Sequence, residues 1–107
     1  MARADTPSGA ELQTLVIARI REILEPNMAL IDPATRFGED LHADSLDLVE
    51  ILESIESELR RRGLQVRLPD ADVAAIRTVG DAVERMTLHL RAADVSPARL
   101  PRTLPQP

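Results

Sequence analysis

The stretch that most constrains this chain is Glu39-Asp40-Leu41-His42-Ala43-Asp44-Ser45-Leu46-Asp47, a serine flanked by carboxylates. Apolar residues then recur at helical spacing as far as Leu59, with acidic residues between them. Asp44 suits the N-cap of that helix, because its side chain can accept from the free backbone N–H groups of the first turn. The pattern therefore predicts a loop that ends at Asp44 and an amphipathic helix that begins at Ser45, with one apolar and one acidic face.

The region from Phe37 to Leu59 contains eight acidic residues and neither lysine nor arginine. Carboxylates three or four residues apart on a helix repel each other by about 0.2–0.5 kcal/mol per pair, and a basic partner surface would relieve that repulsion. Ser45 is poorly placed as a catalytic nucleophile, because no local base can take its proton and the negative field opposes an alkoxide. These features favour a serine that another protein modifies, at the start of a docking helix.

A first helix and a long loop precede this helix. Ser8-Gly9-Ala10-Glu11 is a capping box, and it predicts a helix that Pro26 ends. The loop then runs to Asp44, and we expect its apolar residues to pack onto the core, because a long connection in a small domain is otherwise unstable. These residues are Met28, Leu30, Ile31, Phe37 and Leu41.

Two more helix starts lie in the second half of the chain. Pro69-Asp70 predicts a short helix that reaches Ala75. Thr78-Val79-Gly80-Asp81 predicts a last helix that reaches about Arg91. The predicted fold class is therefore all-α, a four-helix bundle of three longer helices and one short helix with a long first loop.

The ends of the chain differ from its middle. Residues 1–7 have no helical period and should form a flexible N-terminus, whereas residues 8–92 should form one domain. Four prolines follow Ala93, at positions 97, 101, 105 and 107. Because proline disfavours regular structure, residues 93–107 are predicted to form a disordered tail.

Composition excludes several classes of function. The 107 residues include no cysteine and two scattered histidines, so we expect neither a disulfide nor a metal site. A net charge of -5 argues against a nucleic-acid partner and for a basic protein partner. No apolar run approaches the roughly 20 residues that span a bilayer, and the start lacks the apolar stretch of a secretion signal, so we expect a cytoplasmic monomer without a transmembrane segment.

Several of these residues together resemble the acyl carrier protein family of phosphopantetheine-dependent carriers. The resemblance runs from about Leu12 to about Leu90. The matching motifs are Phe37-Gly38-Glu39-Asp40-Leu41, Asp44-Ser45-Leu46, Val49-Glu50, Leu68-Pro69-Asp70 and Ile76-Arg77-Thr78-Val79. The resemblance implies that Ser45, between Asp44 and Leu46, receives a 4'-phosphopantetheine arm from coenzyme A and carries acyl groups on it as thioesters. The chain would then be no enzyme but a carrier that serves fatty-acid, lipid or specialised biosynthetic enzymes.

The resemblance also implies partners and a place for the cargo. The partners would be a phosphopantetheinyl transferase and the acyl-loading and acyl-transferring enzymes, which present basic docking surfaces. The docking residues would be Asp44, Leu46, Asp47, Val49, Glu50, Glu53 and Glu56. The acyl chain would slip between the second and third helices, where the matching residues are Leu46, Ile51, Ile55, Ile76 and Val83.

Three positions depart from the family pattern. His42 stands where these carriers commonly have glycine, Glu53 stands where many have an apolar residue, and the connector from Arg60 to Arg67 is longer than usual. These departures favour specialised partners. A carrier for an aminoacyl or peptidyl group and an unmodified acidic adaptor for a basic protein therefore remain alternatives. A serine hydrolase is the weakest reading, because no nucleophile-elbow glycine pattern surrounds Ser45.

Overall fold

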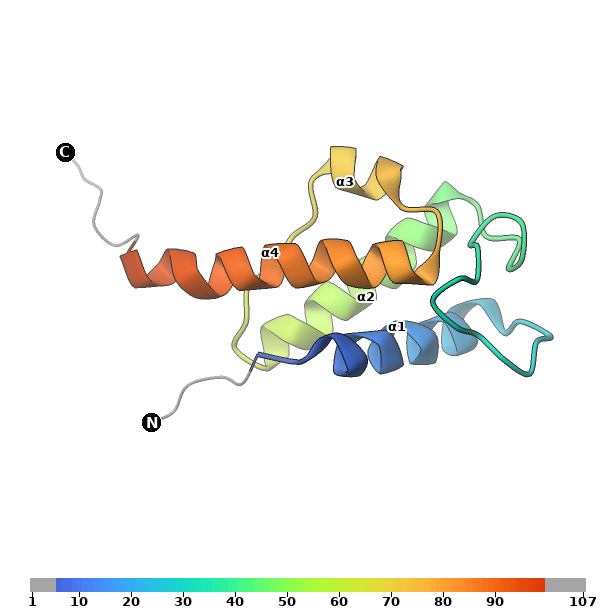
Figure 1. The fold of residues 1–107 in the computed structure, drawn as a ribbon, viewed down its shortest axis with the longest axis horizontal. Helices are drawn as coiled ribbons and strands as arrows, with labels where there is room; N and C mark the ends of the chain where they lie inside the picture. Colours follow the sequence, from blue (N-terminus) through green and yellow to red (C-terminus); the bar gives the residue numbers. More distant parts are fainter. Residues whose placement is uncertain (1–5, 100–107) are drawn as a thin grey trace.

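A computed structural model describes residues 6–99 of the chain and contains four helices and no strand over that range (Figure 1). The helices are α1 (Gly9–Leu24), α2 (Ser45–Arg61), α3 (Asp70–Ala75) and α4 (Val79–Arg99). α1 packs against both α2 and α4, and the short α3 contacts α4. The predicted all-α bundle of three longer helices and one short helix with a long first loop is confirmed.

Local signals account for the ends of these helices. α1 begins with the predicted capping box, in which Ser8 Oγ accepts from the Glu11 N–H at 3.1 Å and the Glu11 carboxylate accepts from the Ser8 N–H at 2.8 Å. α2 ends in a Schellman motif, because the N–H groups of Gly63 and Leu64 donate back to the carbonyls of Arg60 and Leu59. Gly63 has a φ of 89°, which a residue without Cβ adopts at little cost.

The end of α4 corrects the sequence analysis. The helix continues to Arg99 rather than ending near Arg91, and it includes Pro97. A proline removes one backbone hydrogen-bond donor. Because Pro97 lies in the last turn of the helix, few helical hydrogen bonds follow it and can be disturbed. The alanines that precede it favour helix. Residues 93–99 are therefore helical, whereas residues 100–107 of the predicted tail lie outside the described residues, as do residues 1–5 of the predicted flexible N-terminus.

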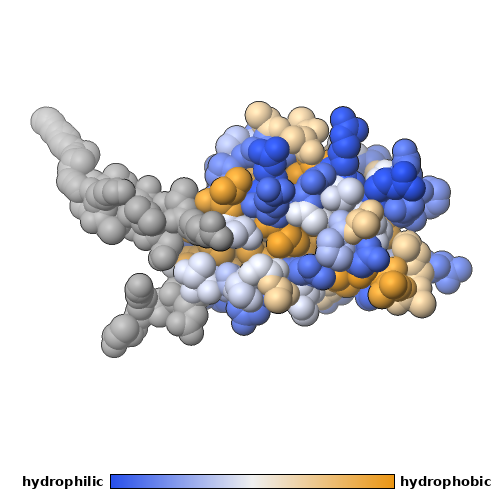
Figure 2. Space-filling view, in the orientation of Figure 1, coloured by the Kyte–Doolittle hydropathy of each residue, from blue (hydrophilic) through white to orange (hydrophobic). Residues whose placement is uncertain are grey.

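The core is aliphatic, as the near absence of aromatic residues predicts. Among residues 6–90, the largest side chains with less than 2% of their surface exposed are aliphatic or methionine. They are Leu12, Val16, Ile20, Ile51, Ile55, Leu59, Val79, Met86 and Leu90. The face of the molecule seen in Figure 2 is largely hydrophilic, with small apolar patches between the charged side chains. None of the helices in residues 6–99 is long and apolar enough to cross a membrane.

The long first loop is fastened to the start of α4. Arg36 and Thr78 form an isolated antiparallel bridge, in which the Phe37 N–H donates to the Arg77 carbonyl at 3.0 Å. The Gly80 N–H donates to the Pro33 carbonyl at 2.9 Å, and a Cβ added at Gly80 would lie 3.1 Å from that carbonyl oxygen. A side chain at this position would therefore push the Pro33 carbonyl away by a few tenths of an ångström.

Most apolar residues of the loop pack inward as predicted. Ile31, Phe37 and Leu41 are buried and Met28 is partly buried, whereas the prediction was wrong for Leu30, which is 70% exposed. Leu30 precedes the buried Ile31, and consecutive side chains in an extended segment point to opposite sides. The packed loop places Phe37 beside the start of α2.

α3 is held mainly through its polar side. It contains no buried residue and has no side-chain cap. Asp72 accepts from Arg85 Nη1 of α4 at 2.9 Å and also pairs with the His89 ring on the same helix. These two contacts, together with the partly buried Val73, keep α3 against α4.

Candidate cofactor attachment site and docking helix

Ser45 is the first residue of α2 and its side chain is exposed. Asp44 forms the predicted N-cap, since its carboxylate accepts from the Asp47 N–H at 2.9 Å. The Asp47 carboxylate accepts in return from the Asp44 N–H at 3.1 Å, which completes a capping box. The two carboxylates therefore fix the backbone around Ser45.

The first turn of α2 leaves backbone donors for an anion. The Asp47 N–H bonds to the Asp44 carboxylate, and the Leu48 N–H bonds to the Asp44 carbonyl at 3.1 Å. The N–H groups of Ser45 and Leu46 have no protein acceptor among the described residues. Free N–H groups at the positive end of a helix stabilise a phosphate. An exposed hydroxyl beside two such donors fits a phosphodiester-linked arm.

The acidic residues between Phe37 and Leu59 fall into two groups, those that pair with an arginine and those that do not. The sequence alone did not separate these groups. Arg36, just before the acidic stretch, pairs with both Glu39 and Asp40. Its guanidinium and its backbone N–H donate to Asp40 and hold the pKa of that carboxyl below its usual value. At the other end of α2, hydrogen bonds from Arg62 and Arg61 lower the pKa of Glu58.

Three of the predicted docking residues are engaged in the fold, namely Glu56 and the two residues of the capping box, Asp44 and Asp47. Glu56 is half-buried, because its carboxylate accepts from the Leu68 N–H at 3.1 Å and so anchors the connector to α3. Asp47 is half-buried in the capping box. Glu50 and Glu53 are exposed and form no ion pair or side-chain hydrogen bond among the side chains of residues 6–90. The repulsion inferred from the sequence is therefore relieved at Glu39, Asp40 and Glu58 and remains at these two residues.

Apolar residues lie beside these free acids. Leu46 is 74% exposed and Val49 is 37% exposed. Leu46, Val49, Glu50 and Glu53 follow the i, i+3, i+4, i+7 spacing of a single helix face. The structure thus brings together four of the seven predicted docking residues in one exposed stripe, which we call the docking stripe. Asp44 lies exposed at its start.

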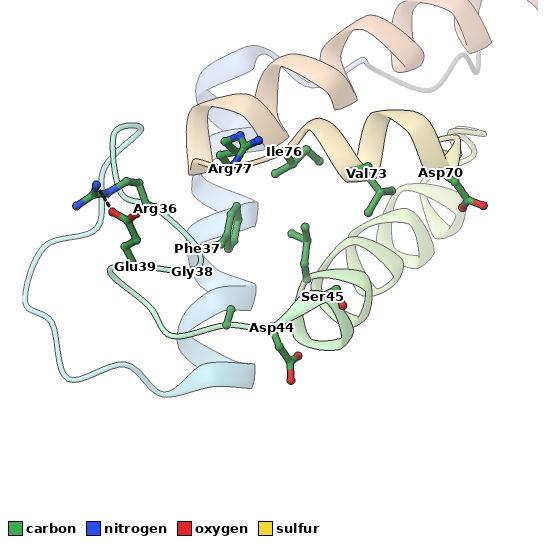
Figure 3. A pocket seen from close by; sticks show the side chains of 13 residues that line it. Arg36, Phe37, Gly38, Glu39, Asp44, Ser45, Asp70, Val73, Ile76 and Arg77 are labelled. Atoms are coloured by element: carbon green, nitrogen blue, oxygen red, sulfur yellow. Dashed lines mark ion pairs between the residues drawn. The ribbon is translucent and has the colours of Figure 1, made fainter.

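A cavity of about 560 Å³ opens next to Ser45 (Figure 3). The loop, the start of α2, α3 and the α3–α4 junction all contribute to it. It is lined by Arg36, Phe37, Gly38, Glu39, Ala43, Asp44, Ser45, Leu48, Asp70, Val73, Ala74, Ile76 and Arg77. Phe37, Leu48, Val73 and Ile76 give it an apolar lining, and such a volume lies in the range of small-ligand sites, about 300–1,000 Å³.

The predicted acyl-chain residues match this cavity only in part. Ile76 lines it, whereas Leu46 points into solvent and Ile51 and Ile55 are fully buried in the core. Val83 packs against the core from α4. Sequence reasoning missed Phe37 and Leu48 as lining residues. Leu48 lies one turn after Ser45 on the buried side of α2, which is a signal that the sequence contained.

His42 adopts the left-handed conformation, with a φ of 57°. Glycine reaches this region without steric cost, while other residues do so at about 1–2 kcal/mol. The backbone therefore gives a physical reason for the glycine that the family pattern has at this place. His42 is exposed, and its N–H donates to the Gly38 carbonyl at 3.1 Å.

Comparisons with known proteins agree with this geometry. Residues 14–86 match the family described as "Phosphopantetheine attachment site". The acyl carrier proteins of Clostridium perfringens strains SM101, ATCC 13124 and 13 are each 36% identical to this chain over 75 residues, which cover 66% of this chain and 92% of the relative. Proteins of this family are non-catalytic carriers of covalently bound 4'-phosphopantetheine. This chain belongs to the acyl carrier protein family.

Proposed function

We propose that Ser45 carries the 4'-phosphopantetheine arm and that this carrier presents acyl groups to enzymes of fatty-acid, lipid or specialised biosynthesis. The observation that supports the attachment residue is the exposed hydroxyl at the first position of α2, beside two backbone N–H groups without a protein acceptor. When bound, the arm supplies a terminal thiol that holds an acyl group as a thioester. Ser45 and the Asp44–Asp47 capping box supply a rigid base for it.

Attachment is a group transfer in which this chain is the substrate. Ser45 Oγ attacks the β-phosphorus of coenzyme A, and a new oxygen–phosphorus bond forms. The bond to the α,β-bridging oxygen breaks and 3',5'-ADP leaves. The hydroxyl proton goes to a base on the transferase, because the residues around Ser45 are carboxylates engaged in the capping box.

The docking stripe gives the surface on which the enzymes would bind. Glu50 and Glu53 attract a basic rim, and Leu46 and Val49 add an apolar contact. Charges of this kind raise the rate of encounter more than the affinity, which suits a carrier that must leave each partner. The exposed Glu53, at a position where many carriers have an apolar residue, favours partners with an additional basic group there.

The cavity beside Ser45 is the proposed acyl site. Its apolar lining from Phe37, Leu48, Val73 and Ile76 would shield a chain from water. Because α3 is held by few contacts, it can shift to admit chains of different size. Ile51, Ile55 and Val83 stand behind this lining in the core and would be reached only by a longer chain.

Intact mass tests the attachment residue. Wild-type chain, Ser45→Ala and Ser54→Ala should be incubated with coenzyme A and a broad-specificity phosphopantetheinyl transferase. We expect one arm on wild type and on Ser54→Ala, and none on Ser45→Ala, whose circular dichroism should match wild type. Ser54 is a matched control on the same helix, and its hydroxyl already donates to the Ile51 carbonyl at 2.9 Å. An arm on Ser45→Ala would reject the proposal, and no arm on any chain would favour an unmodified adaptor.

The alternative cargo is an aminoacyl or peptidyl group, and it is favoured by the same exposed Glu53. The loading enzyme separates the two. Transfer from an acyl-loading enzyme without transfer from an amino-acid-activating ligase supports the acyl carrier, and the reverse result supports the aminoacyl carrier.

A further inference from the structure

The cavity beside Ser45 contains a cation that the fold does not use. Arg36 and Arg77 both line it, but Arg36 pairs with Glu39 and Asp40. Arg77 forms no ion pair with the side chains of residues 6–90. Its backbone is fixed on both sides, because its N–H donates to the Asp81 carboxylate at 3.0 Å and its carbonyl accepts from Phe37. The junction therefore fixes the backbone of Arg77, while its guanidinium, at the edge of the cavity, has no counter-ion among the side chains of residues 6–90.

The position of Arg77 relative to Ser45 determines what it can meet. Figure 3 shows Ser45 at the start of α2 and Arg77 at the α3–α4 junction, on opposite sides of the cavity. Phe37 and Ile76 lie near Arg77 and give the cavity its apolar lining between the two sides. A phosphate bonded to Ser45 Oγ stays at the first turn of α2. What can reach Arg77 is the free end of a group that lies across the apolar lining.

The charges around the cavity differ between its two ends. Asp70, at the start of α3, is exposed and forms no ion pair within the described residues, and α3 separates it from Arg77 (Figure 3). A carboxylate would be attracted toward Arg77 and repelled from Asp70. An uncharged methyl end would gain nothing from either residue. The charges around the cavity therefore favour a cargo whose carboxylate lies at the Arg77 end and not at the Asp70 end.

On this basis we propose that Arg77 determines cargo specificity by pairing with an anionic group, a carboxylate, at the free end of a short acyl chain. The proposal rests on the proposed function, since the chain must first be attached through the arm. Arginine suits this role because its planar guanidinium binds a carboxylate through two hydrogen bonds. Arg77 is exposed, and an exposed pair changes the bound-to-free ratio by only about two- to fivefold. The cargo would be held briefly and released to a partner.

The test compares two cargoes of the same shape. The full chain should be loaded, from the corresponding coenzyme A thioesters, with a six-carbon dicarboxylic acyl group or with its neutral half-amide. Intact mass first verifies loading, so that a failure of attachment is seen separately from a failure of this inference. Nuclear magnetic resonance then follows the Arg77 Nε–H signal and the backbone amides of Phe37 and Ile76.

We expect the carboxylate cargo to shift these signals more than the half-amide does, with the difference decreasing at high salt. Arg77→Gln should remove the difference, and Arg77→Lys should restore part of it. Arg60→Gln is the matched control, because Arg60 is exposed at the far end of α2, about 22 Å along the helix from Ser45. These substitutions leave the backbone contacts of residue 77 in place.

Three results would overturn the inference. The two cargoes could give equal shifts in wild type, or the difference could persist in Arg77→Gln. Alternatively, the unloaded arm alone could shift the Arg77 signal as much as the carboxylate cargo does, which would mean that Arg77 contacts the arm and not the end of the cargo.

Discussion

The two ends of α2 are built for different purposes. At its C-terminal end, Glu58 pairs with Arg61 and Arg62 and lies 3.7 Å from Arg19 of α1. Leu59 is fully buried there, and Gly63 closes the helix. At the N-terminal end, Leu46 is mostly exposed, and one turn further on Glu50 has no counter-ion among the described residues. The helix therefore pairs its charges where it joins the bundle and leaves Glu50 unpaired near the end where we propose that it meets other proteins.

This contrast separates the acidic residues that the fold pairs from those that it leaves unpaired, which are the proposed docking residues. All eight acidic residues between Phe37 and Leu59 look alike in the sequence, yet the fold matches some and leaves Glu50 and Glu53 unmatched. A like-charge stretch on a helix is therefore best interpreted after counting the cations that the fold brings to it.

The largest expected difference between the ends is in stability. Leu59→Ala should lower the free energy of unfolding by about 2–5 kcal/mol, because it leaves a cavity in the core. Leu46→Ala removes an exposed side chain and should change it by less than about 0.5 kcal/mol. Urea denaturation of both variants measures the difference. Similar losses would show that Leu46 contributes to packing and not to a free surface.

The second difference concerns partner encounter. Reversing Glu50→Lys and Glu53→Lys together should slow arm transfer by a phosphopantetheinyl transferase about tenfold at low salt, because steering by charge is lost. Each single reversal should be compared with Glu84→Lys, an equivalent change at an exposed site on α4. The effect should vanish near 1 M salt, where the Debye length is about 3 Å. If Glu84→Lys lowers the rate of arm transfer as much as Glu50→Lys or Glu53→Lys does, the effect comes from net charge and not from the docking stripe.

The third prediction compares the two left-handed residues that flank α2. Gly63→Ala should destabilise the protein by about 1 kcal/mol, because alanine must adopt a positive φ. His42→Gly should stabilise it by about 0.5–1 kcal/mol, since the strain of about 1–2 kcal/mol exceeds the entropy of about 0.4–1 kcal/mol that glycine adds to the unfolded chain. Thermal unfolding measures both. A loss of stability in His42→Gly would indicate that the imidazole makes a stabilising contact.

The smallest expected effect is a pH dependence at the C-terminal end. The pKa of Glu58 is lowered in the folded state, chiefly by Arg62. Its ion pairs therefore add stability above the unfolded pKa of glutamate, about 4.3, and this stability is lost as the pH falls through the lower folded value. Glu58→Gln and Arg62→Gln should each reduce the acid destabilisation seen between pH 5 and pH 3 in chemical denaturation. An unchanged pH profile in both variants would contradict this assignment.

The sequence predicts the helix starts well, because each one depends on residues within a single turn. Ser8 with Glu11 and Asp44 with Asp47 form the hydrogen bonds expected of capping boxes. The end of α4 was not predictable in the same way, since one proline weighs against several good helix formers. Contacts between distant segments were also beyond the sequence. Nothing local shows that the Phe37 N–H donates to the Arg77 carbonyl or that Phe37 lines a cavity together with Val73 of α3.

The candidate site can be divided in the same way, into features set by local sequence and features that depend on contacts between distant segments. The serine, its cap and the exposed stripe follow from helix periodicity and local chemistry. The cavity requires the loop to fold onto the α3–α4 junction, so Phe37, Val73 and Arg77 could not be selected from the sequence as its lining. The bond between the Leu68 N–H and the Glu56 carboxylate joins residues twelve apart, so the sequence did not show that Glu56 also holds the connector to α3.

Peptide mapping tests the central claim most directly. Trypsin cleaves after arginine, and the peptide from Phe37 to Arg60 contains no internal site while holding Ser45, Ser54 and Ser57. Chain modified with coenzyme A and a transferase should be digested and this peptide fragmented in a mass spectrometer. We expect the added mass on every fragment that contains Ser45 and on none that contains only Ser54 and Ser57. An added mass that remains with the Leu46–Arg60 part of the peptide would contradict the account.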